Sequence, residues 1–454
     1  MNIKDYTQAI DYLKSFFNLE NVSRYNYSRE LKLERMKDLL EKFNNPQDSF
    51  KAVHVAGSKG KGTVSASLFQ IFKESGYKVG LYTSPHLLNF RERIRVSTNK
   101  TDDPIGFGDT ISEEDLVRVV SIAKPIIEEF SSDSRWGKPT FFEIYTLVAF
   151  LYFKDKNLDL AIIEVGLGGR LDATNVMNSI LTIITKIVFE HTDKLGEEIT
   201  QITDEKCGIL KEGIPCVLGV QKWTQVVGRV KDNAGKKSVP LHVIDEDIEL
   251  EEKDRSFSIS FGASKYINLK TNLLGHFQYQ NLALSVAAAH LLSEDYPNLS
   301  LPSIRSALSD ICWPGRMQLI KKSPVIILDS AHTPESVELL GDELKRSYPD
   351  RDIVSILAIS SDKDKRGIID QASKFSSSII FTRALSSRLS YQEELIDIAN
   401  ELGLINYSVE YDFECFMSKI LNKSDKKRLY LIAGSIFLVS KALEVFKYGA
   451  LQTR

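Results

Sequence analysis

A glycine-rich loop between a predicted strand and a predicted helix is the clearest feature of the N-terminal half. Residues 53–56 form a short apolar run that ends at Gly57, and apolar side chains at helical spacing follow from Thr63 to the stop at Gly76. Residues 78–83 then predict a second strand. A β-loop-α-β unit has parallel strands, so it indicates an open α/β sheet with ligands bound at the carboxyl ends of its strands.

The loop sequence GSKGKGT, residues 57–63, is typical of phosphate binding. Its backbone N–H groups and the helix N-terminus can surround phosphate oxygens, and Lys61 can reach the outer phosphates. The strict Walker pattern is not met, since position 55 is Val and Gly62 separates Lys61 from Thr63. The alternative is a glycine-rich turn with a solvated lysine pair, but the strand-loop-helix context favours nucleotide binding. The predicted ATP contacts here are Gly60, Lys61, Gly62 and Thr63.

The length of 454 residues predicts more than one domain, because domains typically hold about 100–200 residues. Strands are predicted at 158–165 and 180–187, an antiparallel excursion between 222 and 270, and a helix at 278–293. A turn at 313–315 marks the expected boundary, with domains 1–312 and 313–454. Alternating strands and helices predict a second parallel α/β sheet, with strands at 325–329, 353–359, 378–382 and 429–433.

Composition narrows the possible partners. Hydrophobic residues make up 43% and charged residues 26%, as in ordinary globular proteins. The net charge of −3 is spread over interspersed residues, so nucleic acid is not an expected partner. No apolar run reaches about 18 residues and no signal peptide is recognisable, so no membrane partner and a cytoplasmic location are expected. Four scattered cysteines have no metal-binding spacing and receive no role.

Several further strings resemble the folylpolyglutamate synthase and dihydrofolate synthase branch of the Mur ligase family. The phosphate loop is followed by YTSPHL and RERI, then by EVGLGGRLDATN, and later by WPGR and LDSAHTP. The ordered set covers nearly the whole chain and is more specific than any one of its members. These strings lie at residues 82–87, 91–94, 164–175, 313–316 and 328–334.

The resemblance implies a P-loop ATPase-like N-terminal domain that binds ATP and folate, and a smaller Rossmann-like C-terminal domain that binds glutamate. It also implies one or two Mg²⁺ ions. ATP would phosphorylate a folate or dihydropteroate carboxylate, and glutamate would attack the acyl-phosphate. The alternatives are a Mur-type ligase for another carboxylate, such as a peptidoglycan precursor, and a non-catalytic ATP-binding relative. A monomer fits the family.

Family resemblance also assigns individual residues. Ser84, Glu143 and His191 are similar to Mg²⁺ ligands, although each alone has a structural alternative: a turn residue, a helix cap and a buried histidine. Lys206 is similar to a lysine that many members carry as a carbamate. A carbamate forms from the neutral amine, so it requires a lowered lysine pKa. The alternative is a surface lysine paired with Asp204 or Glu205.

The remaining assignments concern ATP, glutamate and the pteridine. Asn281, Arg316 and Asp329 resemble ATP contacts, with Asp329 as a helix cap in the alternative. His332 resembles a catalytic histidine near glutamate and the γ-phosphate, and Ser435 a residue that lines the substrate site. The predicted pteridine loop consists of Leu171, Asp172 and Ala173, in which Asp172 either accepts hydrogen bonds from an aminopyrimidine or stabilises the turn.

The chain departs from the family pattern at four positions. Lys59 and Thr333 stand where bacterial members usually have Asn, and both resemble eukaryotic folylpolyglutamate synthases. Glu190 replaces the usual Asp before His191. Ser330 replaces a usual Gly, which raises the question whether that position needs a positive φ.

Overall fold

The computed structural model divides the chain into two compact units. It describes residues 3–22, 27–100, 107–133, 135–253, 255–384, 386 and 388–452. The N-terminal unit holds the described residues up to Asn272 together with Phe277–Ile311. The C-terminal unit holds Leu273–His276 and the described residues from Cys312 onward. The unit boundary after Ile311 lies next to the turn at 313–315.

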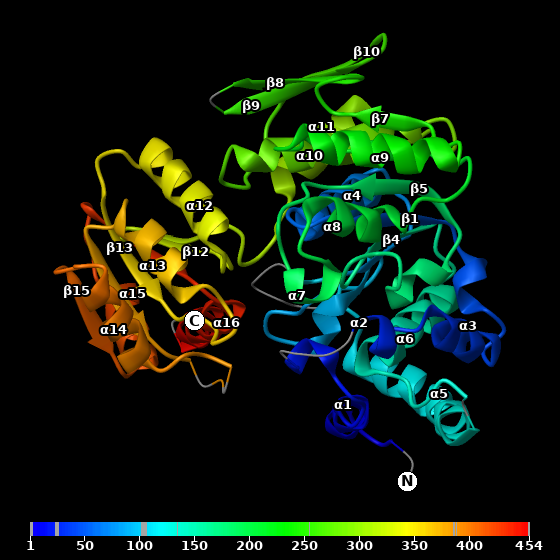
Figure 1. The fold of residues 1–454 in the computed structure, drawn as a ribbon, viewed down its shortest axis with the longest axis horizontal. Coiled ribbons are helices and arrows are strands. Elements are labelled where there is room, and N and C mark those ends of the chain that lie inside the picture. Colours follow the sequence, from blue (N-terminus) through cyan, green and yellow to red (C-terminus); the bar gives the residue numbers. More distant parts are fainter. Residues whose placement is uncertain are drawn as a thin grey trace. The chain divides into compact units, whose positions relative to one another are not determined.

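A seven-stranded sheet forms the centre of the N-terminal unit (Figure 1). All neighbouring strands are parallel except β3, which runs antiparallel to β2. The predicted parallel sheet is therefore confirmed. In spatial order the strands are β3 (Ile94–Val96), β2 (Val79–Tyr82), β4 (Leu160–Glu164), β1 (Ala52–Ala56), β5 (Ser179–Ile184), β6 (Cys216–Leu218) and β7 (Leu241–Val243).

Helices cover the sheet and close two hydrophobic clusters. One cluster joins α1, α3, α5 and α6 to β1–β4, and the other joins α8 and α9 to β5 and β6. The α-helices are α1 (Tyr6–Lys14), α2 (Tyr27–Glu30), α3 (Leu33–Glu41), α4 (Lys61–Glu74), α5 (Glu113–Asp133), α6 (Phe141–Lys156), α7 (Thr192–Leu195), α8 (Ile199–Cys207), α9 (Thr224–Lys236), α10 (Phe277–Leu291) and α11 (Leu301–Asp310). The 3₁₀ turns are η1 (Leu19–Asn21), η2 (Pro46–Ser49), η3 (Phe90–Arg93) and η4 (Ala173–Val176).

The helix after the phosphate loop begins earlier than predicted. It starts at Lys61 rather than Thr63, with Gly60 as its N-cap at φ +94°. Apolar periodicity is visible only from Val64, whereas the start depends on the positive φ that glycine adopts without strain. The first turn therefore contains both Lys61 and Gly62.

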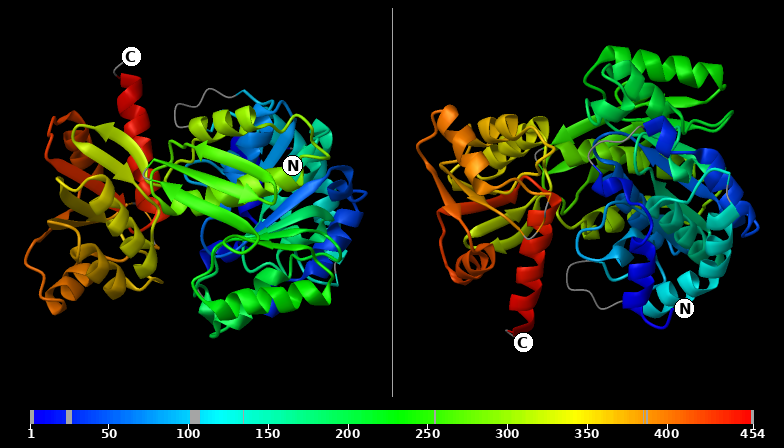
Figure 2. Two further views of the ribbon diagram at one scale, coloured as in Figure 1. Left: turned by 90° about the horizontal axis from the view of Figure 1, so that it is seen from above. Right: turned by 60° about the horizontal axis from the view of Figure 1, so that its bottom comes forward.

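The antiparallel excursion is shorter than predicted. Three antiparallel strands, β8 (Ile248–Lys253), β9 (Ser256–Phe261) and β10 (Ser264–Leu269), form a separate small sheet (Figure 2). Residues before it instead form α9 and β7, and β7 is parallel to β6. The small sheet lies against α10, where the rings of Phe257 and Tyr279 stack. The prediction missed α9, whose buried face carries Val226 and Val230 at helical spacing.

The C-terminal unit contains a six-stranded sheet that is parallel except at its β11 edge. In spatial order the strands are β11 (Gln318–Lys322), β12 (Val325–Leu328), β16 (Arg428–Ala433), β13 (Asp352–Leu357), β14 (Ser378–Thr382) and β15 (Tyr407–Glu410). The four predicted strands are confirmed. The two edge strands were missed because neither is an apolar run, as edge strands have only one paired side.

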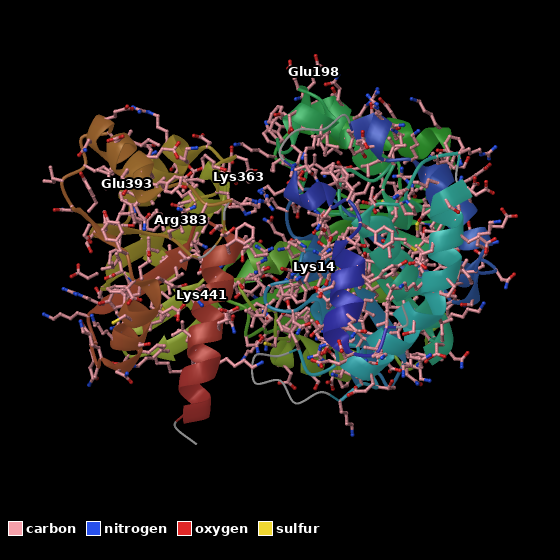
Figure 3. The ribbon with its side chains drawn as sticks, turned by 90° about the horizontal axis from the view of Figure 1, so that it is seen from below. Lys14, Glu198, Lys363, Arg383, Glu393 and Lys441 are labelled. Atoms are coloured by element: carbon pink, nitrogen blue, oxygen red, sulfur yellow. The ribbon has the colours of Figure 1, made fainter. Side chains whose placement is uncertain are left out.

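Helices α12 (Pro334–Ser347), α13 (Lys365–Ser373), α14 (Gln392–Glu401), α15 (Phe413–Asn422) and α16 (Ile436–Gln452) complete the C-terminal unit. An ion pair joins α15 to α16, since Lys441 Nζ lies 2.6 Å from Glu414 Oε1 (Figure 3). Among the residues with a described position, no helix has both the length and the apolar character to cross a membrane. The cysteines are free thiols.

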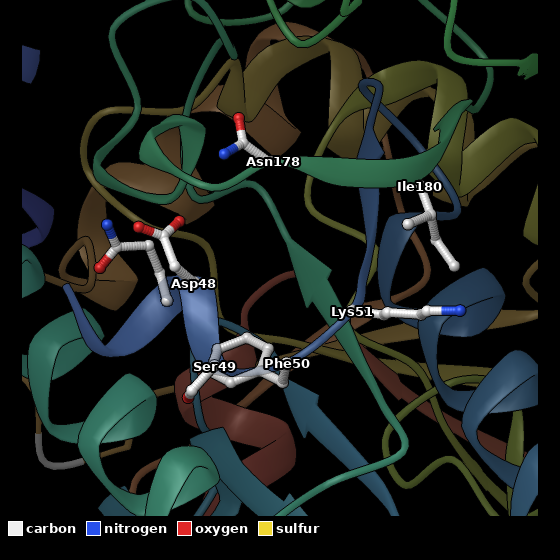
Figure 4. A pocket seen from close by; sticks show the side chains of 7 residues that line it. Asp48, Ser49, Phe50, Lys51, Asn178 and Ile180 are labelled. Atoms are coloured by element: carbon white, nitrogen blue, oxygen red, sulfur yellow. The ribbon is translucent and has the colours of Figure 1, made fainter.

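A shallow, open depression lies at the amino edge of the N-terminal sheet. It has a volume of about 380 Å³ and is bounded by residues just before β1 and at the start of β5 (Figure 4). Ligands of open α/β sheets bind at the opposite, carboxyl edge. We therefore assign this depression no function. Its lining residues are Gln47, Asp48, Ser49, Phe50, Lys51, Asn178 and Ile180.

Candidate active site

The phosphate loop is fastened to the segment that follows β5. The backbone N–H groups of Ser58 and Lys59 donate to the carbonyl oxygen of Lys186 at 2.9 and 3.0 Å. At Gly57, φ is +138° and a Cβ atom would lie 1.9 Å from Thr185 Oγ1, so only glycine fits. These contacts hold the loop between the carboxyl end of β1 and the first turn of α4.

Lys61 lies at the first position of α4, and its Nζ donates to the carbonyl oxygen of Gly57 at 3.0 Å. The ammonium group is thereby folded back over the loop. The N-terminus of a helix attracts anions through its unpaired N–H groups and its dipole. The loop, the helix N-terminus and Lys61 together can hold the phosphates of a nucleotide.

Asn281 of α10 lies directly against this loop. A Cβ atom on Gly60 would be 2.1 Å from Asn281 Oδ1, so glycine at position 60 makes room for the amide. Asn281 Nδ2 donates to Gln278 Oε1 at 3.0 Å, which orients the side chain. The structure therefore brings Asn281 together with Gly60 and the first turn of α4, although 220 positions separate them in the sequence.

Lys206 is buried beside the same loop, with 1% of its side chain exposed. Its Nζ donates to the carbonyl oxygen of Gly57 and to Glu190 Oε1, both at 3.0 Å. Burial lowers the pKa of Lys206, and Glu190 acts in the opposite direction. Burial opposes ionisation of Glu190, but the ammonium groups around it, Lys206 first, outweigh burial and hold its pKa at about 2.

The surface alternative for Lys206 is therefore wrong. The carboxylate of Asp204 instead accepts hydrogen bonds from Arg229 at 2.6–2.7 Å. The carboxylate of Glu205 accepts from Arg170 at 2.7–2.9 Å and from Tyr27 at 3.0 Å. One side of α8 thus binds the glycine-rich loop after β4, while Lys206 points into the phosphate loop.

Ser84 and Glu164 meet at the carboxyl edge of the sheet. Ser84 follows β2 and its backbone N–H donates to Glu164 Oε2 at 3.2 Å. Glu164 is the last residue of β4, is 5% exposed, and is paired in register with Val55 just before the phosphate loop. His191 follows β5 and is exposed. The alternative of a buried histidine is therefore wrong.

Glu143 has a different role from the predicted one. Arg35 Nε donates to both of its carboxylate oxygens, at 2.9 and 3.0 Å, and Thr140 donates from its backbone and hydroxyl at 2.7 and 2.9 Å. Glu143 and Thr140 form the capping box of α6. The protein thus occupies both oxygens, and the structural alternative of a helix cap describes Glu143. Glu164, which the sequence interpretation did not single out, is the carboxylate beside Ser84.

The carboxylate of Asp172 is likewise used by the protein. It accepts from the backbone N–H of Leu167 at 2.9 Å and of Thr174 at 3.0 Å, and it is 2% exposed. Asp172 is the N-cap of η4, with Leu171 half-buried and Ala173 buried beside it. The structural alternative of a stabilised turn therefore describes Asp172.

The predicted residues of the C-terminal unit lie around the carboxyl ends of β12 and β16. Asp329 accepts from the backbone N–H groups of Met317 and Ala331 at 2.8 and 2.7 Å, and burial raises its pKa. Arg316 is half-buried and opposes that rise electrostatically. Asp329 orders the turn after β12 and does not act as the cap of α12, whose N-cap is Thr333.

His332 and Ser435 are positioned by backbone contacts in the same region. His332 Nδ1 lies 2.8 Å from the carbonyl oxygen of Ser330. Ser435 Oγ accepts from the backbone N–H of Leu438 at 3.2 Å at the start of α16. The backbone at Gly434 donates to the carbonyl oxygen of Ala331 at 2.9 Å, which joins the two turns. Ser330 does not adopt a positive φ, so its replacement of glycine causes no strain.

The donor set suits a Mg²⁺ ion that is shared with a nucleotide. Among the residues that the structure describes, no three His, Cys, Asp or Glu side chains are grouped to hold a metal. A Mg²⁺ ion retains several waters and takes phosphate oxygens, so few protein ligands suffice. Ser84 and Glu164 supply hard oxygen atoms at the edge that carries the phosphate loop.

Comparison with known proteins places the chain. Residues 315–436 match the family described as Mur ligase, glutamate ligase domain. The dihydrofolate synthase/folylpolyglutamate synthase of Bacillus subtilis is 34% identical over 415 residues, 90% of this chain and 93% of that protein. The folylpolyglutamate synthase of Lacticaseibacillus casei is 30% identical over 81% of this chain and 82% of that protein.

Solved structures agree over nearly the full length. Folylpolyglutamate synthase from Thermotoga maritima has a TM-score of 0.82 at 31% identity, covering 98% of this chain and 97% of that chain. E. coli FolC in complex with DHPP and ADP has a TM-score of 0.82 at 25% identity, covering 98% and 99%. The chain belongs to the folylpolyglutamate synthase and dihydrofolate synthase branch of the Mur ligase family.

Proposed function

We propose that this protein is an ATP-dependent ligase that joins glutamate to a folate-type carboxylate through an acyl-phosphate. The observation that carries the proposal is the pair of lysines, Lys61 and Lys206, that converge on the Gly57 carbonyl beside a helix N-terminus. Relatives named for this activity match both units. The glutamate ligase domain match supports assigning glutamate to residues 313–454, and ATP and folate to residues 1–312.

Nucleotide binding rests on the phosphate loop. Gly60, Gly62 and Thr63 offer backbone N–H groups, and Lys61 neutralises charge on the transferring phosphoryl group. Asn281 lies against the loop and is the candidate contact from α10. Arg316 and Asp329 stay proposed contacts from the C-terminal unit. Related structures that contain ADP or AMPPCP support ATP as the co-substrate.

We assign Mg²⁺ binding to Ser84, Glu164 and His191, with Glu164 in place of Glu143. The reason is the contact between Ser84 and Glu164, together with the engagement of Glu143 by Arg35. When bound, the metal ion neutralises charge on the phosphates. His191 is a less usual ligand for a hard cation, and its place after β5 supports it.

The chemistry has two steps. A substrate carboxylate oxygen attacks the γ-phosphorus of ATP, which forms the acyl-phosphate and releases ADP. The glutamate amine then attacks the acyl carbon, loses a proton and expels phosphate, which forms the amide. The first step is needed because a free carboxylate has a poor leaving group. Lys61 and Lys206 supply positive charge for the first step, and His332 is the proposed residue near the amine in the second.

Substrate recognition is assigned to the loop after β4 and to the C-terminal unit. Leu171 and Ala173 remain candidates for apolar contact with the pteridine, while Asp172 shapes the loop from within. Ser435 remains a candidate for lining the glutamate site. The comparisons do not favour a ligase for another carboxylate or a non-catalytic relative. A monomeric state and a cytoplasmic location stay predictions.

Phosphate release tests the proposal. Protein with ATP, Mg²⁺ and glutamate should release phosphate only after dihydropteroate or a reduced folate is added, and mass spectrometry should find one added glutamate. Lys61→Ala should lower kcat by about 10³-fold because it removes the charge on the transferring group. Lys154→Ala, at the exposed end of α6, is the control. Turnover without a folate, or full activity of Lys61→Ala, contradicts the assignment.

A further inference from the structure

Glu190 and Lys206 form a buried ion pair at the base of the phosphate loop. Lys206 Nζ lies 3.0 Å from Glu190 Oε1, and the two side chains are 1% and 13% exposed. Glu190 follows β5, and Lys206 lies in the last turn of α8. Two elements that flank the loop are therefore held together by one carboxylate and one ammonium group.

The contacts of Lys206 suit an ammonium group. A protonated lysine has three N–H donors and no acceptor. Two of the donors go to the Gly57 carbonyl oxygen and to Glu190, both at 3.0 Å. Each partner is a pure acceptor, so the positive form of Lys206 satisfies both of them.

A carbamate at this position does not fit these contacts. Its formation joins the neutral amine nitrogen to the carbon of CO₂ and releases one proton, leaving a single N–H and a new carboxylate. One N–H cannot donate to both the Gly57 carbonyl oxygen and Glu190. The new carboxylate would also stand beside the buried carboxylate of Glu190, and like charges in a buried site are costly.

We propose that Glu190 supplies the carboxylate of this site from the protein itself, so that Lys206 works unmodified as an ammonium group. Glu190 is then a positioning residue: it holds Lys206 on the Gly57 carbonyl, which Lys61 also contacts. The catalytic part of this statement rests on the proposed ligase function, but the chemical state of Lys206 does not.

Carbon-13 NMR tests the state of Lys206 directly. The protein is equilibrated with ¹³C-bicarbonate at neutral pH, and Lys206→Arg serves as the blank because an arginine at this position forms no lysine carbamate. We expect the same carbamate region in both spectra. A resonance present in the wild type and absent from Lys206→Arg overturns the proposal, whatever the enzyme turns out to catalyse.

Kinetics tests the positioning role. Glu190→Gln removes the charge and should lower kcat by about 100-fold, while Glu190→Asp keeps the charge and should stay within about tenfold of wild type. Glu197→Gln makes the same change at an exposed carboxylate in the loop before α8 and should behave as wild type. Wild-type turnover should be equal in CO₂-free and bicarbonate-containing buffer.

These outcomes separate the two proposals. If Glu190→Gln retains wild-type kcat, or if bicarbonate raises wild-type turnover at constant pH, Glu190 does not replace a carbamate. If no folate-dependent turnover is found, the ligase assignment fails while the NMR comparison still decides the state of Lys206. If Glu190→Gln fails to fold, the NMR comparison and the bicarbonate dependence of the wild type decide it.

Discussion

Glu143 and Glu164 are both buried acids, but their contacts give them different work. Arg35 and Thr140 occupy both oxygens of Glu143, so Glu143→Gln leaves a buried arginine without its counter-ion. Removing one partner of such a pair costs about 3–5 kcal/mol. We expect urea unfolding of Glu143→Gln to show a loss of this size, with kcat near the wild-type value under conditions where the variant remains folded.

Glu164→Gln provides the matched comparison. The glutamine oxygen can still accept the Ser84 N–H, so stability should change by less than about 1 kcal/mol. Loss of the charge should raise the Mg²⁺ concentration needed for half-maximal turnover and lower kcat by about 100-fold. If Glu143→Gln instead shows the Mg²⁺ defect, the original assignment of Glu143 is correct.

His54 should make the protein sensitive to mild acid. It is fully buried in β1 with Nε2 2.8 Å from Thr174 Oγ1, and burial, with Lys211 second, lowers its pKa to about 3. An unfolded histidine binds its proton near pH 6.5, so this contribution is complete above pH 6.5 and is lost as the pH falls toward 3. Between pH 7 and 5 it removes about 2 kcal/mol.

His54→Gln tests this dependence, because the amide can still donate to Thr174 but does not titrate. The free energy of unfolding, measured in urea at pH 7 and pH 5, should fall by about 2 kcal/mol less in the variant than in the wild type. Equal falls in the two proteins would show that His54 is not the group responsible.

Close packing between α8 and the loop after β4 is what positions Lys206. A Cβ atom on Gly208 would lie 2.3 Å from Arg170 Cα, and one on Gly169 would lie 2.7 Å from the Glu205 carbonyl oxygen. Backbone atoms cannot yield as a flexible side chain can. Gly208→Ala should therefore destabilise the protein by about 1–3 kcal/mol and lower turnover, as measured by thermal unfolding and phosphate release.

Gly228→Ala is the control within the neighbouring helix. Gly228 lies inside α9, where an added Cβ atom would meet nothing within 4 Å. Alanine is favoured over glycine in a helix, so this change should stabilise the protein by about 0.5–1 kcal/mol. A stable, fully active Gly208→Ala would mean that the loop shifts without consequence for Lys206.

The two units have separate sheets, and a short segment of the N-terminal sequence belongs to the C-terminal unit. The backbone N–H of His276 donates to the buried Glu343 of α12 at 3.0 Å, and Ser347 Oγ donates to the same carboxylate at 2.6 Å. Glu343→Ala removes both acceptors and should destabilise the C-terminal unit by about 1–3 kcal/mol.

Hydrogen exchange can localise this effect. Amides of β12, β13 and β16 should exchange faster in Glu343→Ala, while those of β1, β4 and β5 should keep their wild-type rates, because domains open as cooperative units. Faster exchange in both sheets would show that the units unfold together. Asp342→Ala, on the exposed side of the same helix, is the control.

Local patterns predicted the parts of the fold that depend on local chemistry. Apolar runs located the central strands of both sheets, and the glycine-rich string at 57–63 located the phosphate loop. Edge strands β11 and β15 escaped prediction because their side chains are largely polar. The start of α4 was placed two residues late, because it depends on the backbone of Gly60 rather than on apolar spacing.

The sequence by itself determined the fold class, the phosphate loop and the family, since these depend on spacing and residue type along the chain. Only the tertiary structure decided which carboxylate meets which partner. It joined Lys206 to Glu190, Glu164 to Ser84 and Glu143 to Arg35. A carboxylate's partner is chosen by the packing of distant elements, which bring together residues that no local pattern relates.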